Sequence, residues 1–394
     1  GTTDGLGAVD YETALAGASS DRAALGERSP DDLYVLYTGG TTGMPKGVMW
    51  RQEDIFFAAM GGGNYGGAPI STPAEITANI GAAPACSLAL APLMHGNAQW
   101  TAFVTLFGGN KLALWASRRF EADGIWDFID AEGINTISLV GDAMARPLVD
   151  ALARRAAPTT LFALVSGGAI LSPAIKQEMQ ERLPNVMVLD SFGASETGAN
   201  GSVDTTGSGP RFRMNEWTTV IDDDFRQAAP GEVGMLARRG HVPLGYWKDE
   251  AKTAATFVEV DGVRWAIPGD KAVIEDDGSI SVLGRGSQCI NSGGEKIFPE
   301  EVEAALKSHP AVFDATVVGV ADPRWGEHVS AVVEFRSGQH ATIEELAEHC
   351  RAHVAGYKVP RTLTVVDTMV RSPSGKPDYR WAKALAAAEH APAN

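Results

Sequence analysis

The first half of the chain alternates short apolar runs with amphipathic segments, and this alternation constrains the fold more than any other feature. Between the apolar runs, residues 121–132, 143–154 and 173–182 have helical patterns, and the last opens with Ser172 as N-cap and Pro173 at the first helical position. Continuous apolar strands that alternate with helices indicate an α/β fold with a mostly parallel sheet covered on both faces. The predicted strands are residues 33–38, 87–90, 111–114, 134–140, 161–165 and 186–189.

The pattern changes twice further along the chain. Residues 200–285 contain short alternating runs with turn signals such as Asp277-Gly278, which predict an antiparallel β-rich extension. The remaining residues predict a small α+β domain, with helices at 300–307 and 343–353 and strands at 315–320, 329–335 and 362–366. We therefore expect a large domain at 1–285, which is α/β to about 200, and a small domain at 286–394, with the boundary near 285–287.

Composition excludes several classes of protein. A length of 394 residues exceeds one ordinary core, and a net charge of −16 makes nucleic acid an unlikely partner, because an acidic surface repels the phosphate backbone. The three cysteines, Cys86, Cys289 and Cys350, form no CxxC pair, so we expect neither a disulfide framework nor a zinc site, and a cytoplasmic location fits best. No apolar run approaches the roughly 20 residues of a transmembrane segment. A homodimer is left open.

Residues 37–47, YTGGTTGMPKG, have the composition of a phosphate-binding loop. Its glycines let the backbone turn tightly and present N–H groups to an anion, its threonines supply hydroxyl donors, and Lys46 supplies a cation. The loop follows a predicted strand and precedes a helical run that starts near Arg51. It is not a Walker A loop, because Pro45 precedes the lysine and Gly47 follows it. The glycines are Gly39, Gly40 and Gly43, and the threonines are Thr38, Thr41 and Thr42.

The loop resembles the signature of the adenylate-forming superfamily, which contains acyl-CoA synthetases, nonribosomal adenylation domains and firefly-type luciferases. Within it the chain is most similar to actinobacterial fatty-acid and sterol side-chain CoA ligases, through YTGGTTGMPKGVMWRQEDIF, GDAMARPLVDAL and GYKVPR. Other motifs follow in the superfamily's order: SGGAI at 166–170, SFGASETG at 191–198, GYWKDEAKTAATF at 245–257, PGD at 268–270, LGRGSQCINSGGEKIFPEEVE at 283–303 and SPSGKPDYRW at 372–381.

The resemblance implies an acid–thiol ligase that uses ATP, Mg²⁺ and CoA. A small-molecule carboxylic acid and ATP would give acyl-AMP and pyrophosphate, and CoA would then give acyl-CoA and AMP, with a small mobile C-terminal domain. It also implies site residues. Lys376, Glu196, Thr41 and Lys46 would be catalytic, with Glu196 as the metal ligand. Nucleotide binding would use the loop residues Thr38, Gly39, Gly40, Thr42 and Gly43, together with Gly167, Gly168, Ala169, Asp190, Phe192, Gly193, Ser195, Asp270 and Arg285.

Two further sets of residues follow from the same resemblance. His95 and Gly96 would lie beside the acyl pocket, although a histidine near a helix start is more often a structural cap. Ser287 would be the hinge, where the family commonly has Asp or Lys. Ser292, Gly293 and Gly294 of SGGEK would contact CoA. His349 and His353 have the i, i+4 spacing of a metal pair, but no third ligand is evident and we expect a solvated helix face.

Three other interpretations stay open from the sequence. A nonribosomal adenylation domain would share the first half-reaction but needs an acidic partner for the substrate amine. A luciferase-like oxygenase has the same fold. The third is an inactive fragment or a nucleotide- or acyl-binding remnant. The family normally has a substantial segment before the phosphate loop, whereas 36 residues precede Tyr37 here, so the large domain is expected to be N-terminally incomplete.

Overall fold

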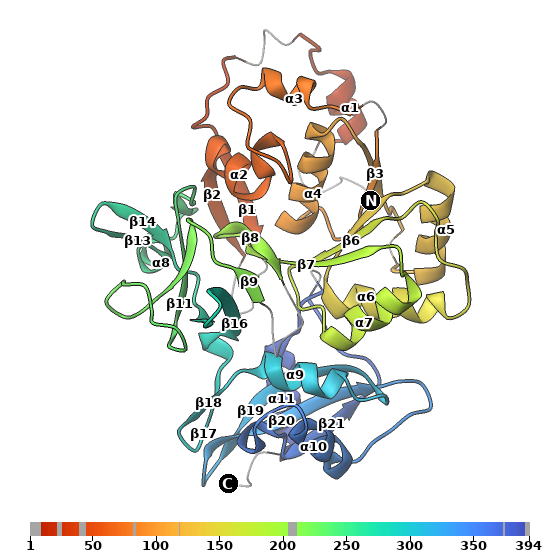
Figure 1. Ribbon diagram of the computed structural model, residues 1–394, viewed down its shortest axis with the longest axis vertical. Helices are drawn as coiled ribbons and strands as arrows, with labels where there is room; N and C mark the ends of the chain where they lie inside the picture. Colours follow the sequence, from red (N-terminus) through yellow and green to blue (C-terminus); the bar gives the residue numbers. More distant parts are fainter. Residues whose placement is uncertain are drawn as a thin grey trace.

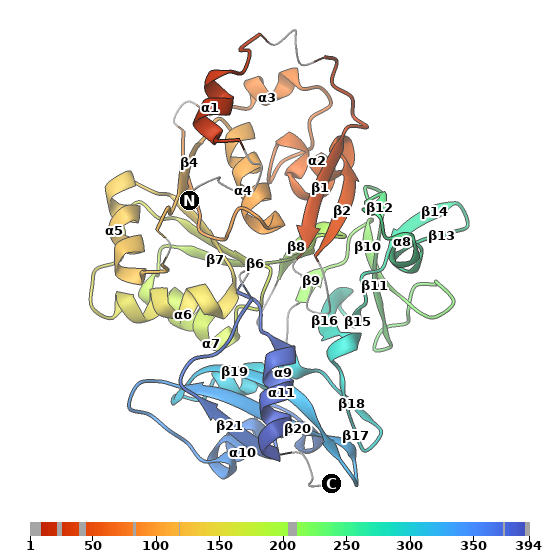
Figure 2. The same ribbon diagram turned by 180° about the vertical axis from the view of Figure 1, so that it is seen from behind.

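The computed structural model describes residues 9–21, 26–38, 45–81, 84–117, 119–203, 211–372 and 375–390. Residues 39–44, with five of the predicted phosphate-loop residues, lie outside this set. We refer to residues 9–285 as the large part and to residues 286–390 as the small part. Figures 1 and 2 show the small part below the large part, with helix α9 (Pro299–Lys307) facing α6 (Gly141–Leu152) and α7 (Pro173–Arg182).

A six-stranded sheet forms the centre of the large part. Its order is β4-β3-β5-β6-β7-β8; the first five strands run parallel and the edge strand β8 is antiparallel. This confirms the predicted α/β class with a mostly parallel sheet. The bounds are β3 (Cys86–Ala89), β4 (Lys111–Leu114), β5 (Thr136–Leu139), β6 (Ala163–Gly167), β7 (Met187–Ala194) and β8 (Gly198–Val203).

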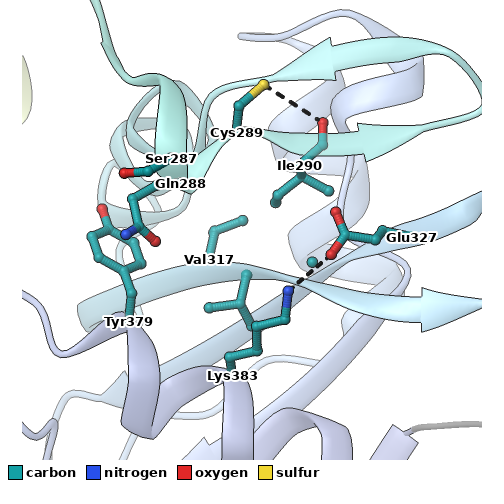
Figure 3. Close-up of a pocket in the computed structure, with 10 residues that line it drawn as sticks. Ser287, Gln288, Cys289, Ile290, Val317, Glu327, Tyr379 and Lys383 are labelled. Atoms are coloured by element: carbon teal, nitrogen blue, oxygen red, sulfur yellow. Dashed lines mark hydrogen bonds and ion pairs between the residues drawn. The ribbon is translucent and has the colours of Figure 1, made fainter. Parts of the chain in front are cut away.

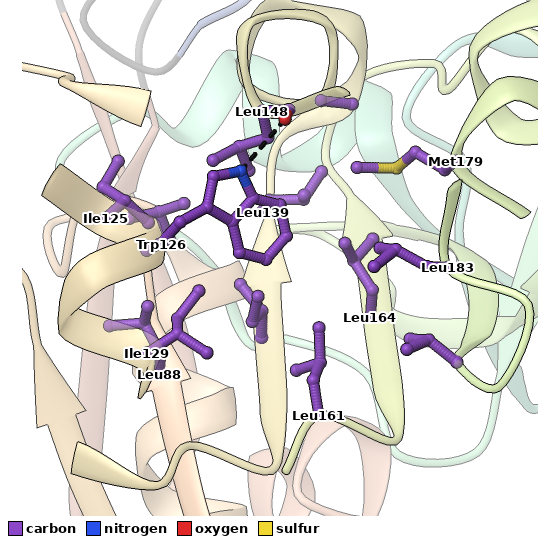
Figure 4. Packing of buried hydrophobic residues seen from close by; sticks show 14 of the residues in the cluster. Leu88, Ile125, Trp126, Ile129, Leu139, Leu148, Leu161, Leu164, Met179 and Leu183 are labelled. Carbon is purple, nitrogen blue, oxygen red and sulfur yellow. Dashed lines mark hydrogen bonds between the residues drawn. The ribbon is translucent and has the colours of Figure 1, made fainter. Parts of the chain in front are cut away.

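The helices α5 (Ala122–Glu132), α6 and α7 pack on this sheet and bury the main core of the large part. Trp126 is fully buried there and its indole N–H donates to the Leu148 carbonyl at 3.0 Å, as Figure 4 shows. Ser172 is the N-cap of α7 as predicted, yet among the described residues its hydroxyl makes no cap hydrogen bond. Its backbone N–H instead donates to the Asp142 carboxylate at 2.7 Å, which ties the start of α7 to α6.

The prediction that residues 33–38 belong to the parallel sheet is wrong. Strand β1 (Leu33–Thr38) pairs antiparallel with β2 (Lys46–Arg51), which also pairs with β12 (Gly245–Tyr246) in a separate three-stranded sheet. The phosphate loop therefore joins two strands of a hairpin, and α2 (Gln52–Ala59) begins after β2. The apolar pattern identified β1 as a strand but carries no information on the direction of its partner.

The β-rich extension is antiparallel, as predicted. It is a seven-stranded sheet of order β13-β14-β11-β15-β16-β9, and β10 pairs with β11. The β15–β16 turn contains Asp277 and Gly278, and Gly278 has a φ of 76° that favours glycine. The bounds are β9 (Arg211–Arg213), β10 (Thr218–Ile221), β11 (Val233–Arg239), α8 (Glu250–Thr256), β13 (Phe257–Val260), β14 (Val263–Ala266), β15 (Asp270–Ile274) and β16 (Ser279–Arg285).

The small part is α+β, as predicted. Its five-stranded sheet has the order β18-β17-β20-β19, and β21 pairs parallel with β20. The long hairpin β19–β20 forms its centre, and α9, α10 and α11 cover it. The predicted helix at 343–353 ends at Arg351. The bounds are β17 (Ile290–Ser292), β18 (Glu295–Ile297), β19 (Val312–Asp322), β20 (Gly326–Phe335), α10 (Ile343–Arg351), β21 (Thr362–Val366) and α11 (Tyr379–His390).

The remaining elements are helices. The helix α4 precedes β4, and the two predicted acyl-pocket residues, His95 and Gly96, lie at its start. None of the helices in the described ranges has the length and apolar composition needed to cross a bilayer. The bounds are α1 (Tyr11–Ala16), η2 (Gly61–Gly63), α3 (Ala74–Ala78), α4 (Gly96–Phe107), η3 (Gly286–Gln288) and η4 (Gly356–Lys358).

Candidate active site

Asp270 and Arg285 face each other on neighbouring strands. They are directly paired in the β15–β16 register, and the Arg285 Nε lies 3.5 Å from the Asp270 Oδ1. Burial raises the pKa of Asp270, and the positive charge of Arg285 opposes this shift. An acceptor and a cationic donor are thus fixed side by side by the sheet, which is the arrangement expected of a pair that binds a diol.

Glu196 is buried in the turn between β7 and β8. Its Oε1 accepts a hydrogen bond of 2.8 Å from the phenol of Tyr246, and Tyr246 belongs to β12, which pairs with β2. The Lys46 ammonium lies 5.4 Å from the centre of the Tyr246 ring. Tyr246 therefore joins Glu196 to the end of the phosphate loop. The turn is also held by the Trp50 indole, which donates to the Ser195 carbonyl at 3.0 Å.

Lys376 comes from the small part but shares the electrostatic environment of these groups. Desolvation lowers the pKa of Lys376 although the residue keeps an exposed surface, and the charge of Arg285 adds to this effect, while Glu196 and Asp270 act to raise the pKa. Lys376 in turn favours the ionised form of Asp270. The charges of Glu196, Asp270 and Arg285 in the large part therefore act on Lys376 of the small part.

The segment before Lys376 docks directly on the large part. Gly375 has a φ of 78°, and a Cβ added there would lie 3.4 Å from a methyl group of Val140, just before α6. The Gly375 carbonyl accepts a hydrogen bond of 2.9 Å from the Arg371 guanidinium, and the Gly375 N–H donates to the Ser372 carbonyl at 2.8 Å. Gly375, the residue before Lys376, is thus held through both its carbonyl and its N–H.

The small residues predicted to line the nucleotide lie where β6, β7 and β8 pack closely together. A Cβ on Gly167 would lie 2.5 Å from the Ser191 hydroxyl, and a Cβ on Gly193 would lie 2.5 Å from the Gly198 carbonyl, so larger residues would displace β7. Gly168 follows with a φ of 89°, before Ala169. The strand ends β6 and β7 can therefore approach a ligand closely with their backbones.

Phe192 and Asp190 lie on β7 beside these small residues. The Phe192 ring stacks on Phe212 with centres 5.4 Å apart and planes 9° apart, so one ring face is occupied by Phe212. Burial raises the pKa of the Asp190 carboxyl to about 7, although the charge of Lys176 opposes the shift. Asp190 therefore lies within β7, next to the edge strand β8, and its carboxyl is largely withdrawn from water.

His95 is the N-cap residue of α4, but its side chain makes no capping hydrogen bond in the described structure. Its Nε2 is buried without a hydrogen-bond partner among the described residues. Burial lowers the pKa of His95, and the Lys376 charge adds to this effect. The side-chain cap considered for His95 is therefore wrong, and its imidazole lies near Lys376 instead. Next to it, a Cβ on Gly96 would lie 2.8 Å from the Trp100 ring.

The predicted CoA-binding residues form a hairpin elsewhere on the small part. Gly293 and Gly294 have φ values of 62° and 91° in the two-residue turn between β17 and β18, and Ser292 pairs with Glu295. The Gly293 N–H donates to the Trp325 carbonyl at 2.8 Å. Both ribbon views show this hairpin away from the β1–β2 hairpin, which flanks the phosphate loop.

Ser287 lies in η3, where the chain passes from the large to the small part. It lines a pocket with Gln288, Cys289 and Tyr379, and the Glu327–Lys383 ion pair of 2.9 Å closes the other side (Figure 3). Burial raises the pKa of the Cys289 thiol, which disfavours the thiolate and hence nucleophilic chemistry there.

His349 and His353 have ring centres 4.8 Å apart on and just after α10. The His349 Nε2 lies 2.8 Å from the Ser308 hydroxyl. Within the ranges that the structure describes, no three His, Cys, Asp or Glu side chains are arranged to hold a metal ion.

Comparison with known proteins identifies the family. The sequence profile of the AMP-binding enzymes matches residues 3–247, and that of the AMP-binding enzyme C-terminal domain matches residues 301–376. The chain belongs to the AMP-binding enzymes. The predicted family membership is thus confirmed.

Relatives of this AMP-binding enzyme cover nearly all of it. It is 49% identical over 393 residues to 3-oxocholest-4-en-26-oate–CoA ligase of Rhodococcus rhodochrous, an alignment covering 96% of this chain and 70% of that protein. The identity is also 49% with a medium/long-chain-fatty-acid and 3-oxocholest-4-en-26-oate CoA ligase of Mycolicibacterium smegmatis, covering 96% of this chain and 71% of that protein. The ATP-bound crystal structure of MatB from Rhodopseudomonas palustris superposes with a TM-score of 0.76 at 25% identity, covering 95% of this chain and 72% of that one.

Four residues that organise the site were not predicted from the sequence. Tyr246 lies inside the GYWKDEAKTAATF motif, so the motif was found but the role of its phenol was not. Asp142 likewise lies inside the GDAMARPLVDAL motif, whereas Arg371 and Lys307 lie outside the quoted motifs. Arg371 supports the loop before Lys376, and Asp142 with Lys307 joins the two parts. Only the distances in the folded chain identify these contacts.

Glu300, at the start of α9, predicts a dependence of stability on pH. Its carboxyl packs so closely on Gly284 that an added Cβ would lie 2.4 Å from its Oε2. Burial raises its pKa from 4.5 to about 8, and the charge of Glu303 adds to the shift. The folded enzyme therefore holds a proton that the unfolded chain releases between these pH values, so folding stability falls as pH rises from about 4.5 to 8.

We expect Glu300→Gln to remove much of this fall, whose upper limit is about 1.4 kcal/mol per pH unit. The melting temperature of the variant should therefore rise relative to that of the unaltered enzyme as pH approaches 8. The measurement is the melting temperature from pH 5 to 8.5, with Glu348→Gln on the exposed face of α10 as control. Parallel curves for Glu300→Gln and the unaltered enzyme would contradict the assignment.

Proposed function

We propose that this AMP-binding enzyme is an ATP-dependent acyl-CoA ligase. A carboxylate oxygen of the acid attacks the α-phosphorus of ATP, the bond to pyrophosphate breaks, and acyl-AMP forms. The CoA thiol then loses its proton and attacks the acyl carbonyl, and the carbon–oxygen bond to AMP breaks. The geometry that carries this proposal is the Asp270–Arg285 pair together with the buried Glu196, and the charges of all three act on Lys376 of the small part.

The first half-reaction brings two anions together and develops further negative charge in the transition state. In our proposal Lys376 bridges the carboxylate and the α-phosphate and neutralises this charge, while Lys46 and the loop residues Thr38, Gly39, Gly40, Thr41, Thr42 and Gly43 hold the outer phosphates. Asp270 and Arg285 bind the ribose hydroxyls. Gly167, Gly168, Ala169, Asp190, Phe192, Gly193 and Ser195 line the adenine.

Glu196 is proposed as the protein ligand of Mg²⁺. Its carboxylate is buried and one oxygen accepts from Tyr246, which leaves the other oxygen for a cation. Mg²⁺ commonly binds one or two carboxylates together with substrate phosphates, so the lack of a three-residue ligand cluster in the described ranges fits a metal that arrives with the nucleotide. When bound, the ion would neutralise phosphate charge.

The acid is proposed to be a fatty acid or a sterol side-chain acid, because relatives that are 49% identical carry these substrates in their names. His95 and Gly96 would border the acyl group. For the second half-reaction we propose two domains, residues 1–285 and 286–394, that rotate about Ser287. The rotation would withdraw Lys376 and bring Ser292, Gly293 and Gly294 to the CoA pantetheine.

The proposal is tested by acid-dependent turnover of ATP. Purified chain is incubated with ATP, Mg²⁺ and one acid from a series of medium- and long-chain fatty acids and 3-oxocholest-4-en-26-oate. We expect acid-dependent ATP–pyrophosphate exchange without CoA, and AMP and acyl-CoA formation after CoA is added. Exchange without thioester formation would indicate another acceptor. The absence of exchange with every acid would overturn the proposal for this chain and favour a binding role.

A further inference from the structure

A buried ion pair joins the two parts of the chain. Asp142 is the second residue of α6 in the large part, and Lys307 is the last residue of α9 in the small part. The Lys307 Nζ lies 3.5 Å from the Asp142 Oδ2, and the two side chains are 7% and 6% exposed. A pair this deeply buried is costly to separate, because each charge would be left without its partner away from water.

The surroundings of Asp142 direct this interaction across the interface. Its Oδ1 accepts the Ser172 backbone N–H at 2.7 Å, whereas its buried Oδ2 has no hydrogen bond among the described residues and faces Lys307. Burial would lower the pKa of Lys307, but the carboxylates of Asp142 and Asp314 outweigh it and raise the pKa above its ordinary value. Lys307 is therefore charged in the assembled enzyme.

The same ion pair connects to the loop that carries Lys376. Lys307 lies 3.7 Å from the Asp314 Oδ1, and Asp314 makes a forked ion pair with Arg371 at 2.5 to 2.8 Å. Arg371 then donates to the Gly375 carbonyl at 2.9 Å. A continuous series of charged contacts thus runs from α6 to the residue that precedes Lys376.

We propose that the Asp142–Lys307 pair is a latch that holds the small part in the orientation that delivers Lys376 to Glu196 and Asp270. Asp142, Lys307 and Arg371 are then positioning residues for adenylate formation. This inference rests on the proposed ligase function. Any movement that carries the small part away from α6 must break the latch, so the pair favours the first half-reaction over the second.

The test separates the two half-reactions in the variants Lys307→Met, Asp142→Asn and their double mutant. Lys307→Met removes the charge but keeps an unbranched side chain of nearly the same length. Asp142→Asn keeps an oxygen that can accept the Ser172 N–H. We expect each single variant to lower acid-dependent ATP–pyrophosphate exchange roughly 10- to 100-fold. The loss in the double mutant should be much smaller than the product of the two single losses, because both substitutions break the same ion pair. Thioester formation from supplied acyl adenylate and CoA should stay within about threefold of the unaltered chain.

A second ion pair across the interface provides a matched control. Arg336 lies 3.2 Å from Asp150 at the other end of α6, but these side chains are 28% and 33% exposed. Because solvent screens this pair, Arg336→Gln should change the exchange rate less than about twofold. An effect as large as that of Lys307→Met would mean that any contact across the interface suffices, and would overturn the specific role of the buried pair.

Proteolysis reports the orientation independently of catalysis. The unlatched variants should be cut faster than the unaltered chain around Gly286–Gln288, with melting temperatures that show a folded protein. Equal loss of both half-reactions, or full exchange activity with unchanged proteolysis, would overturn the latch. If the unaltered chain shows no exchange with any acid, the ligase proposal fails. The rates of proteolytic cleavage still test the latch in that case.

Discussion

Lys376→Ala is expected to reduce acid-dependent ATP–pyrophosphate exchange by about 10²- to 10³-fold. The reason is that the substitution removes a cation aimed at the charge that develops when carboxylate and α-phosphate meet, and groups of this kind contribute about 10²- to 10³-fold each. Arg285 remains in the site, yet it is held by Asp270 at 3.5 Å and cannot replace the lost ammonium. The measurement is exchange at saturating ATP and acid.

The second half-reaction supplies the internal control for Lys376→Ala. Thioester formation from supplied acyl adenylate and CoA should be largely retained, because the thiol attacks the acyl carbon and Lys376 is proposed to be withdrawn before that step. Lys111→Ala removes an exposed lysine that pairs with Glu132 and should leave both rates unchanged. If Lys376→Ala depressed both half-reactions equally, its assignment to adenylate formation would be wrong.

Glu196→Gln is expected to lower the exchange rate by about 10²-fold at a fixed Mg²⁺ concentration. The substitution keeps the volume and an oxygen for the Tyr246 hydroxyl, but it removes the negative charge that faces Lys376 and is proposed to bind the metal. The rate should therefore recover in part as Mg²⁺ is raised. The measurement is the exchange rate over a Mg²⁺ titration.

Tyr246→Phe is the matched control for Glu196→Gln. It removes the 2.8 Å hydrogen bond but keeps the carboxylate and the ring that lies beneath Lys46, so we expect a loss of a few fold and an unchanged Mg²⁺ dependence. A Glu196→Gln variant with normal activity at low Mg²⁺ would show that the carboxylate is not the metal ligand.

The prediction from sequence succeeded where the signal is local. The apolar runs at β5 and β6 identified strands buried on both faces, and the turn at Asp277-Gly278 identified an antiparallel hairpin, because each pattern reflects the surroundings of the segment itself. The prediction failed for β1, since an apolar run does not reveal whether the partner strand is parallel or antiparallel.

The candidate site divides in the same way. Glu196, Asp270 and Arg285 were found because each stands in a motif of a recognisable family, and the structure pairs Asp270 with Arg285 at 3.5 Å. The role of Tyr246 was missed, because its motif does not reveal that the phenol turns toward Glu196. The alternative that the His95 side chain caps a helix was wrong, since a helix start permits a cap but does not require one.

The sequence by itself determined the family, the α/β class with its β-rich extension and small α+β part, and the identity of most groups that could act on ATP. Only the tertiary structure decided which of these groups meet and what holds them together. Asp142 and Lys307 lie far apart along the chain, in segments without a common motif, and their pairing follows from how α6 and α9 pack. Burial then gives the pair its importance, because two charges removed from water are stable only in each other's presence.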